Sequence, residues 1–364
     1  MKVLMQIRPD TDKYPGGDFI QLLKTKEYLE QAGIEADISH SPKAHLKHYD
    51  IVHLFNVTRI TDTCLFFDNA QKQGKKIVIS PIYHSLKDME NFYRFYYKFP
   101  FLNIVLYLSL KEIFYPLRAR SPFSLKSIFT YKNVVKNVLG KSHLLLPNSH
   151  MERWCIENEL HVDNRCCIIP NAAELGTKRV NQERKEDMIV CVGRIEPRKN
   201  QNYVIKAFEK GLKNFPPHIE LIFIGALNKS HKSYCEEFVN HIARISERVK
   251  YLGPQSHDKV LHFFKKARLS VLASFFETTG LVGLEALSCG TNVVITERGY
   301  TGEYFGHNAV YCNPYSVDSI SEAMVRAFYE HVKTEEIEDL ISKCSWKNAA
   351  ALTEKAYKEV MDET

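Results

Sequence analysis

Two carboxylates in the C-terminal third of the chain lie eight residues apart, at the ends of Glu277-Thr278-Thr279-Gly280-Leu281-Val282-Gly283-Leu284-Glu285. This segment follows the apolar, strand-like run Leu269–Ser274 and opens a helical pattern that stops at Gly290. A strand, a loop of small residues and a helix, in that order, direct backbone N–H groups and a helix N-terminus at one point, which suits a phosphate. Carboxylates accept hydrogen bonds from hydroxyl groups. The pattern therefore predicts a site for a phosphorylated ligand rich in hydroxyl groups.

A solvated helix face is the alternative explanation, because two Glu residues at this spacing are common by chance. Against it, Glu285 stands between Leu284 and Ala286 in a short apolar helix, where a charge needs a partner or a ligand. We therefore treat Glu277 and Glu285 as candidate site residues.

A second segment suited to phosphate lies about eighty residues upstream, where Gly193-Arg194-Ile195-Glu196-Pro197-Arg198-Lys199-Asn200 follows the strand pattern Met188–Val192. Arg194 can bind a phosphate through two parallel hydrogen bonds, and Lys199 adds a compact charge. Such cations can neutralise a diphosphate leaving group, on which charge grows during transfer of its substituent. An exposed basic turn is the alternative, but the position at a strand end favours the phosphate site.

Two weaker candidates follow other strand patterns. Gly16 and Gly17 come after the first strand and permit close approach of the backbone to a phosphate or sugar, although the G-x-G-x-x-G dinucleotide fingerprint is absent. His84 follows the strand pattern Lys76–Ser80 and can donate a hydrogen bond to a sugar hydroxyl or to a developing charge. Ordinary structural roles for all three remain open. Asp10-Thr11-Asp12 has no partner His or Glu nearby, so we expect no metal there.

Composition bounds the class of protein. The chain has 364 residues, of which 45% are hydrophobic and 25% charged, so it is long enough for two globular domains of ordinary size. We expect no signal peptide, and the longest apolar stretch, Phe101–Leu110, is too short to span a bilayer. Nine cysteines without a C-x-x-C pair favour a reducing, cytoplasmic location, and the net charge of +6 is compatible with anionic ligands.

Strand and helix patterns alternate along most of the sequence. The strand patterns are Lys2–Ile7, Ala36–Ser39, Ile51–Phe55, Lys76–Ser80, His143–Pro147, Cys167–Pro170, Met188–Val192, Glu220–Ile224, Val249–Leu252, Leu269–Ala273, Asn292–Thr296 and Val310–Cys312. Helical patterns include Asp18–Gly33, Gln201–Gly211, His231–Arg248 and Trp346–Thr364. Two such series predict an α/β protein with two doubly wound, Rossmann-like domains that face each other across a cleft. The polar segment Glu174–Asp187 is the expected linker.

These motifs together resemble the retaining GT-B glycosyltransferases of family four, the glycosyl transferases group 1. The similarity rests on Gly193-Arg194 with Lys199, Pro170-Asn171, Gly16-Gly17, Tyr251-Leu252-Gly253-Pro254 and the segment from Glu277 to Glu285. The resemblance covers nearly the whole chain and is more specific in the C-terminal half. It implies domains at 1–178 and 186–345, and a terminal helix, 346–364, that crosses back to the N-terminal domain.

The resemblance also implies a role for each site residue. Arg194 and Lys199 would hold the nucleotide diphosphate, Glu285 the ribose hydroxyls, and Gly253 to Gln255 the base. Glu277 would hold the donor sugar together with the backbone of Thr279, Gly280 and Leu281. Gly17, next to Gly16, would approach the phosphates from the other domain, and His84 would lie near the reacting sugar. Two departures from the family pattern are Thr278-Thr279-Gly280 in place of Gly-Phe-Gly, and Ala172-Ala173-Glu174 in place of Gly-Val-Asp.

The resemblance further implies a UDP- or GDP-sugar donor, no cofactor and no obligatory metal. Attack on the front face of the sugar would retain its anomeric configuration, and the leaving diphosphate would take the acceptor proton. An epimerase of the same fold and a non-catalytic subunit that binds sugar nucleotides are the alternatives.

The stretch Leu86–Gly140 has the most unusual composition. It holds 13 of the 42 aromatic residues and nine Lys or Arg against three Asp or Glu. Aromatic side chains interleaved with cations suit a membrane interface with anionic lipids. Stacking on acceptor sugars and internal helix packing are the alternatives, and nucleic acid is not an expected partner. The hypothesis is an acceptor that is a glycan or a lipid-linked glycan of surface polysaccharide synthesis, reached at the inner face of a membrane.

Overall fold

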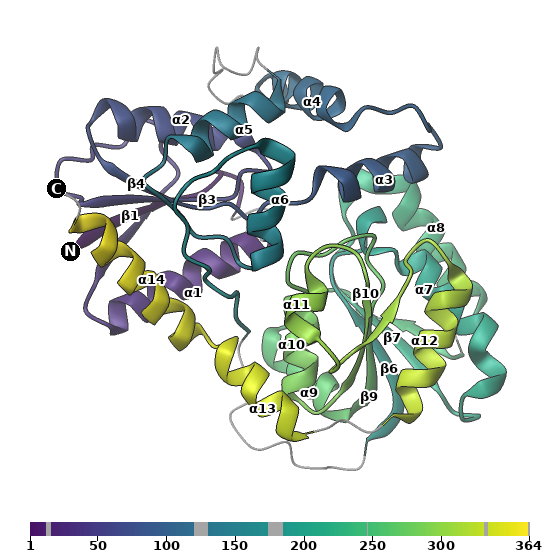
Figure 1. Ribbon diagram of the computed structural model, residues 1–364. Coiled ribbons are helices and arrows are strands. Elements are labelled where there is room, and N and C mark those ends of the chain that lie inside the picture. The colour runs from purple at the N-terminus through teal and green to yellow at the C-terminus, as the bar shows by residue number, and fades with distance from the viewer. Residues whose placement is uncertain (12–15, 120–129, 174–184, 246, 331–333, 363–364) are drawn as a thin grey trace. The chain divides into compact units, whose positions relative to one another are not determined.

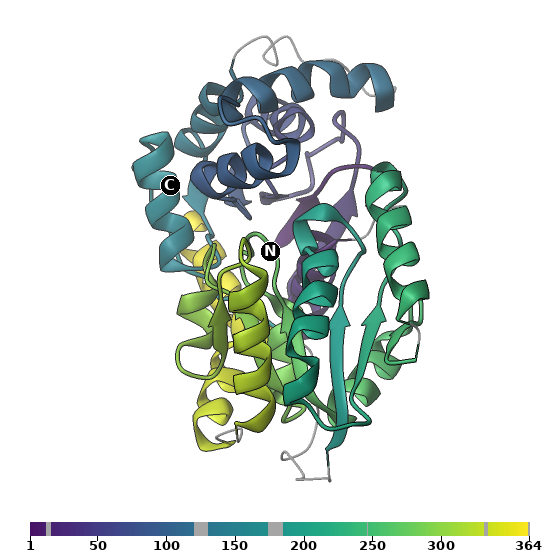
Figure 2. The same cartoon turned by 90° about the vertical axis from the view of Figure 1, so that its right-hand side faces the viewer.

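The computed structural model describes residues 1–11, 16–119, 130–173, 185–245, 247–330 and 334–362 (Figure 1). The chain divides into two compact units. The first consists of Met1–Ala172 together with Trp346–Thr364, and the second of Ala173–Ser345. Each unit contains one parallel sheet with helices on both faces, as Figures 1 and 2 show. The predicted α/β class with two doubly wound sheets is therefore confirmed.

The sheet of the first unit has five parallel strands in the order β2-β1-β3-β4-β5. They are β1 (Lys2–Gln6), β2 (Glu35–Ser39), β3 (Ile51–Phe55), β4 (Lys76–Ser80) and β5 (Leu144–Leu145). Val3 of β1 pairs with Ala36 on one side and with Ile51 on the other. The strand order therefore reverses between β1 and β3, which makes their carboxyl ends a place for ligands in such sheets.

Helices cover both faces of this first sheet. They are α1 (Gly17–Gln31), α2 (Ile60–Lys72), α3 (Leu86–Tyr97), α4 (Ile104–Ala119), α5 (Tyr131–Gly140), α6 (His150–Leu160) and α14 (Trp346–Met361). Leu22 and Leu29 of α1 share a core with Val3, Met5 and the buried face of α14. On the other face α2 packs on β3 and β4 and against α5.

Helix α14 is also attached to the sheet by a buried polar contact. Nδ1 of His53 on β3 lies 2.7 Å from the Tyr357 hydroxyl of α14, and Nε2 lies 2.9 Å from the Ser80 hydroxyl of β4. Burial lowers the pKa of His53 to about 3, so the imidazole is neutral at pH 7. The C-terminal helix thus belongs to the first unit through both apolar packing and hydrogen bonds.

The sheet of the second unit has six parallel strands in the order β11-β10-β9-β6-β7-β8. They are β6 (Glu186–Val192), β7 (Glu220–Ile224), β8 (Val249–Tyr251), β9 (Ala267–Leu272), β10 (Asn292–Thr296) and β11 (Val310–Cys312). Ile189 and Cys191 face one core while Met188 and Val190 face the other, as the period of two in a strand requires. The order of the strands reverses between β6 and β9.

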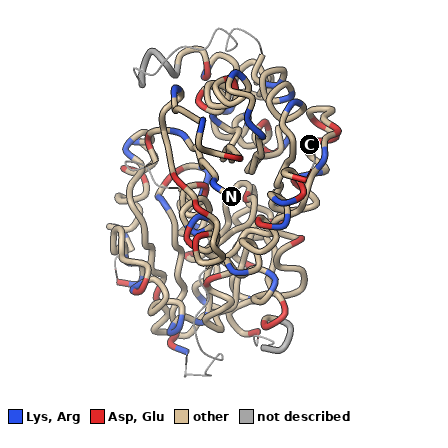
Figure 3. The backbone as a smooth tube through the Cα atoms, turned by 90° about the vertical axis from the view of Figure 1, so that its left-hand side faces the viewer, with Lys and Arg blue, Asp and Glu red and all other residues tan. Residues whose placement is uncertain are grey.

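The helices of the second unit fill the two cores. They are α7 (Gln201–Gly211), α8 (Lys232–Arg244), α9 (His257–Lys266), α10 (Leu281–Ser288), α11 (Thr301–Phe305), α12 (Val317–Tyr329) and α13 (Thr334–Lys343). Short 3-10 turns lie at Pro197–Lys199, Leu212–Asn214 and Lys229–His231. Helices α7, α8 and α12 contribute to one core, and α9, α10 and α13 to the other. Basic and acidic side chains are interspersed along the backbone of both units (Figure 3).

Some expected boundaries are wrong. The stretch Cys167–Pro170 is no strand, although Cys167 N–H donates to Leu145 O at 2.9 Å. It runs beside β5, which has only two residues before Pro147, so the ladder is reduced to a single bridge. Part of the expected linker, Glu186–Asp187, opens β6, while 174–184 lies outside the described residues. The helical pattern expected to reach Arg248 ends at Arg244.

Candidate active site

The carboxyl ends of β6 and β9 bring together the two segments that the sequence singled out in the second unit. These strands are neighbours at the reversal of the strand order, where open parallel sheets bind ligands. The loop after β6 carries Arg194 and Lys199, and the loop after β9 carries Glu277. The Phe275 N–H donates to Arg198 O at 2.8 Å, which joins the two loops directly.

Glu277 is the centre of this arrangement. Its buried carboxylate forms an ion pair with Lys199 and accepts a hydrogen bond from the Ser274 hydroxyl at 2.6 Å. Nη1 of Arg198 lies 3.5 Å from the other carboxylate oxygen. Burial alone would raise the pKa of Glu277, but Lys199 and Arg198 outweigh it and lower the pKa to about 2. Glu277 is therefore an ionised acceptor at neutral pH.

Lys199 is the half-buried counterpart of this carboxylate, with 17% of its side chain exposed. Burial lowers the pKa of its ammonium group, and the negative charge of Glu277 opposes that effect. Glu277 carries a full charge beside it, so the pair is held as ammonium and carboxylate. A half-buried cation at the carboxyl end of a parallel sheet has already lost part of its contact with water, so an anionic ligand has less water to displace from it.

Arg194 is the more accessible cation of the same loop, with 42% of its side chain exposed. Its Nη2 lies 3.6 Å from Glu196, a carboxylate that Arg198 also approaches at 3.6 Å. Burial would raise the pKa of Glu196, but Arg198 and Arg194 lower it. Asn228, from the loop after β7, donates to Glu196 at 2.9 Å. Glu196 thus holds Arg194 at the loop and leaves part of its guanidinium to solvent.

Two glycines allow the loops to approach one another closely. Gly225, after β7, has φ +147°, and a Cβ there would lie 2.0 Å from Gly193 O. Gly299, after β10, has φ +87°, and a Cβ there would lie 1.9 Å from Glu277 O. Only glycine satisfies both the backbone angle and the space at these positions. The loops around Glu277 and Arg194 are therefore fixed by backbone packing.

Helix α10 begins directly beyond this cluster. Gly280 is its N-cap with φ +78°, and the helix starts at Leu281. The first N–H groups of a helix have no acceptor within it, so they are available to a ligand. The buried Thr279 hydroxyl, next to them, lacks a hydrogen-bond partner among the described residues. A donor or acceptor on a bound molecule would satisfy it.

Glu285 and the loop after β8 form the outer part of the site. Glu285 Oε1 lies 3.2 Å from Nε2 of His257, at the start of α9. Gly225 N–H donates to Gly253 O at 3.0 Å, so the loops after β7 and β8 are connected. The Gln255 amide donates to Leu252 O at 2.8 Å. The loop from Gly253 to Gln255 therefore lies at the same sheet edge as Glu285.

The remaining expected residues, Gly16, Gly17 and His84, belong to the first unit. Gly16 is the N-cap of α1, which starts at Gly17. Asp18, in the first turn of this helix, binds Arg8 at 3.1 Å and accepts from Asn56 at 2.8 Å. A carboxylate thus already lies at this helix N-terminus.

His84 lies in the loop after β4, and two carboxylates of α6 hold this loop. Glu152 accepts from Tyr83 N–H and Glu159 from Leu86 N–H, both at 2.7 Å. Ser85 also donates to Glu159 at 2.7 Å. The backbone on both sides of His84 is therefore fixed before any ligand binds.

Comparison with known proteins identifies the family of the second unit. Residues 176–343 match the family model described as glycosyl transferases group 1. The second unit belongs to the glycosyl transferases group 1. This match includes the loop after β6 with Arg194 and Lys199, the residues Glu277 and Glu285, and the loop after β8.

Curated relatives cover the chain only in part. This chain is 29% identical to an uncharacterized glycosyltransferase of Methanocaldococcus jannaschii over 192 residues. The aligned part is 51% of this chain and 48% of that protein. The chain is 34% identical over 116 residues to D-inositol 3-phosphate glycosyltransferase of Mycobacterium tuberculosis, or 31% of this chain and 23% of that protein. The chain thus spans about half the length, or less, of these relatives.

Solved structures match over the whole chain and show the GT-B fold. Sucrose-phosphate synthase of Thermosynechococcus elongatus aligns with a TM-score of 0.74 at 14% identity and covers 100% of both chains. Anabaena HepE, in its complex with UDP and glucose, aligns with a TM-score of 0.68 at 17% identity and covers 99% of this chain and all of that one. At such identities the similarity concerns the fold alone.

Four contacts of the group 1 domain were not anticipated from the sequence. Arg198 lies in the same segment as Arg194 and Lys199, but nothing in the spacing indicated that it reaches Glu277. Ser274, Glu196 and His257 have no signal of their own, since each acquires its role only when separate loops meet. The apolar surroundings of Glu285 in the sequence did predict that its carboxylate needs a partner. They did not indicate that this partner is His257.

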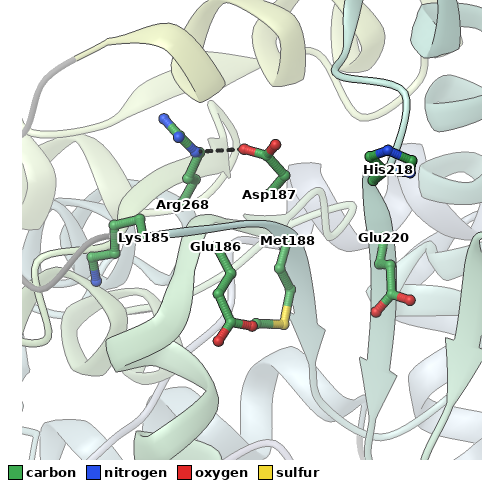
Figure 4. A pocket seen from close by; sticks show the side chains of 7 residues that line it. All are labelled: Lys185, Glu186, Asp187, Met188, His218, Glu220 and Arg268. Carbon is green, nitrogen blue, oxygen red and sulfur yellow. Dashed lines mark ion pairs between the residues drawn. The ribbon is translucent and has the colours of Figure 1, made fainter.

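Two pockets on the second unit lie away from the carboxyl ends of its strands. One, of about 420 Å³, is lined by residues at the amino ends of β6, β7 and β9, among them Lys185 and His218 (Figure 4). Its Arg268–Asp187 ion pair, 2.9 Å long, already neutralises both charges. The other, of about 250 Å³, lies around Asn292 and His307. Because ligands of parallel sheets bind at carboxyl ends, neither is the candidate site. The described residues contain no group of three or more His, Cys, Asp or Glu arranged to hold a metal ion.

Proposed function

We propose that this chain is a glycosyltransferase that moves a sugar, with retention, from a UDP- or GDP-sugar to a glycan or lipid-linked glycan. The observation that carries the proposal is the ion pair of Lys199 with the ionised Glu277 at the reversal of the second sheet. A cation suited to phosphate thus lies beside a carboxylate suited to hydroxyl groups, and a sugar diphosphate requires both. The group 1 family and the GT-B fold support the same reading.

Each loop of the proposed site would contact a different part of the donor. Arg194 and Lys199 would bind the diphosphate, and Glu277 would accept hydrogen bonds from the sugar, beside the N–H groups of α10. Glu285 would accept from the ribose hydroxyls, and the loop from Gly253 to Gln255 would lie against the base. Side-chain cations then take the neutralising role of a divalent ion, so we propose that transfer needs no metal.

Lys199 and Glu277 would exchange partners when the donor binds. In the structure the ammonium group neutralises the carboxylate. A diphosphate carries more negative charge and attracts the ammonium group, so the carboxylate gains a free lone pair for a sugar hydroxyl. Binding of the diphosphate would in this way prepare the sugar subsite.

The bond changes of the proposed transfer are simple. The bond between the anomeric carbon and the diphosphate oxygen breaks, and its electron pair stays on the diphosphate, next to the cations. The acceptor hydroxyl attacks from the same face, and its proton passes to the departing diphosphate oxygen. For the first unit we propose Gly17 as a backbone contact to the phosphates and His84 as a hydrogen-bond partner of the reacting sugar.

We place the activity on the cytoplasmic side of a membrane, in surface polysaccharide synthesis. The basis is the cation-rich, aromatic stretch of the first unit, which suits an acceptor on a lipid carrier.

A screen of donors tests the proposal. UDP, GDP and their common sugars are first ranked by thermal shift, because a ligand selective for the folded chain raises its melting temperature. The best donor is then followed for release of nucleoside diphosphate in the presence and absence of EDTA. We expect slow hydrolysis that EDTA leaves unchanged and that Glu277→Ala abolishes. The control Glu236→Ala changes an exposed carboxylate of α8 and should retain the rate.

Other outcomes of this screen would overturn the proposal. Interconversion of the donor sugar without any acceptor would indicate an epimerase. Tight binding with no turnover under any acceptor would indicate a non-catalytic subunit.

A further inference from the structure

Helix α4 of the first unit presents apolar side chains on two opposite sides. Ile104 and Leu108 are buried, where the helix packs on α3 and α5. On the solvent side, Leu106, Leu110 and Phe114 are 60%, 46% and 55% exposed. Their spacing of four residues places them in one stripe along the helix. A helix that is apolar on its solvent side as well has a surface that folding of this chain does not bury.

The apolar surface continues at the turn that precedes α4. Phe101 is 83% exposed and Phe99 53%, and their rings meet edge to face, with centroids 6.5 Å apart. We call Phe99, Phe101, Leu106, Leu110 and Phe114 the hairpin surface, because they lie on the connection between α3 and α4 and on α4 itself. Single exposed apolar residues are ordinary, but several within sixteen residues mark an interaction site.

Charge identifies the kind of partner. Lys98 and Lys111 are exposed beside the hairpin surface, whereas the half-buried Arg94 forms an ion pair with Glu90 of the same helix. From Asn91 to Lys111 the sequence contains no Asp or Glu. The next acidic residue, Glu112, is buried and accepts from Thr61. The hairpin surface therefore combines exposed aromatic and aliphatic side chains with the exposed positive charges of Lys98 and Lys111.

Tyrosines add a third feature of interfacial helices. Tyr93 and Tyr97 of α3 stack on one another, and both contact the tilted ring of Tyr107 on α4, whose hydroxyl lies 3.3 Å from that of Tyr97. Aromatic rings with a polar edge are enriched where hydrocarbon meets water. No described helix is long and apolar enough to cross a bilayer, so contact with a membrane through these residues would be from one side.

We propose that the hairpin surface docks on an anionic lipid bilayer. Leu106, Leu110 and Phe114 enter the boundary between headgroups and acyl chains, and Lys98 and Lys111 lie at the lipid phosphates. The inference rests on the proposed function in one respect, since a lipid-linked acceptor gives the docking its purpose. The physical basis is separate: apolar area drives insertion, and the cations select for anionic lipid.

Sedimentation with vesicles tests this inference on the full-length chain. Vesicles of phosphatidylcholine alone are compared with vesicles that contain about one third phosphatidylglycerol. We expect binding to the anionic vesicles, weakened by salt and at least tenfold lower on neutral ones. Leu106→Ser with Phe114→Ser should lower the binding about tenfold or more. Lys98→Gln with Lys111→Gln should lower it about fivefold for each cation removed.

A matched control pair changes exposed apolar residues elsewhere. Trp154→Ser on α6 and Val239→Ser on α8, 54% and 43% exposed, should leave vesicle binding unchanged. Circular dichroism checks that all variants are folded. The donor hydrolysis of Leu106→Ser with Phe114→Ser should equal that of the unmodified chain, so loss of docking is distinguishable from loss of the proposed activity.

Three results would overturn the inference. The first is absence of binding to anionic vesicles by the unmodified chain. The second is a change in oligomeric state of the serine variants in sedimentation velocity, which would make the hairpin surface an interface between copies. The third is a higher KM of these variants for a soluble acceptor with vesicle binding unchanged, which would make it a sugar-stacking surface.

Discussion

At the scale of single residues, Lys199 and Glu277 are one another's partners. A buried charge without a partner is costly, so each residue stabilises the other. The sequence predicted both as site residues from their positions after strands. It could not predict their ion pair, because they lie 78 residues apart and meet only when β6 and β9 become neighbours.

The partner exchange predicts an unusual response to Glu277→Gln. The variant removes the charge that competes with a diphosphate for Lys199, so UDP or GDP alone should bind about three- to tenfold more tightly. The matching sugar nucleotide should lose the additional affinity that its sugar provides. Isothermal titration with nucleotide and sugar nucleotide measures both effects. Weaker binding of the nucleotide alone by this variant would contradict the exchange.

The pKa of Glu277 predicts how stability depends on pH. Its pKa is about 2 in the folded chain, below the ordinary value of 4.5, so the unfolded chain binds more protons between these values. The stabilising contribution of the carboxylate is complete above about pH 4.5 and is lost as the pH falls towards 2. Its full size is about 3 kcal/mol, one pKa unit being worth about 1.4 kcal/mol.

Urea unfolding between pH 6 and pH 3 measures this contribution. The free energy of unfolding should fall less steeply with acidification in Glu277→Gln than in the unmodified chain. The control Glu236→Gln, at an exposed site, should keep the original slope. Equal slopes in all three proteins would mean that Glu277 is not held ionised by Lys199 and Arg198.

At the scale of elements, the alternation of strands and helices was predictable because buried parallel strands have continuous apolar sequences. Glu220–Ile224 and Asn292–Thr296 agree with the structure in both bounds. Cys167–Pro170 failed because an apolar run becomes a strand only where a neighbour can pair with it, and β5 is too short. Sequence patterns likewise did not reveal which loops touch, as the contacts of Glu196 with Asn228 and of Glu285 with His257 show.

The close approach of the loops after β6 and β7 predicts a strong effect of Gly225→Ala. The new Cβ would lie 2.0 Å from Gly193 O, in a backbone conformation that alanine rarely adopts. We expect a loss of about 3 kcal/mol or more in unfolding free energy, or displacement of the loop that carries Arg194. Gly302→Ala, in α11 with open space around its Cβ, is the control and should change stability by less than about 1 kcal/mol. A fully stable Gly225→Ala with unchanged nucleotide affinity would contradict the fixed-loop description.

At the scale of the whole molecule, each unit has its own sheet and its own cores, and the chain returns to the first unit through α14. The doubly wound class was predictable from the two series of strands. The tie between His53 and Tyr357 was not, because those residues are 304 positions apart. Arg194, Lys199, Glu277 and Glu285 lie in the second unit, whereas Gly17, His84 and the hairpin surface lie in the first. The proposed donor contacts thus come from both units, and the proposed membrane contact from the first alone.

A crystal structure with the best-binding sugar nucleotide tests the central claim most directly. We predict that the diphosphate lies at the carboxyl ends of β6 and β9, within hydrogen-bond distance of Arg194 and Lys199. Glu277 should have left Lys199 and should accept a hydrogen bond from the sugar. A sugar nucleotide bound elsewhere, for instance in the hollow beside Lys185 and Arg268, with the ion pair of Lys199 and Glu277 intact, would contradict the account.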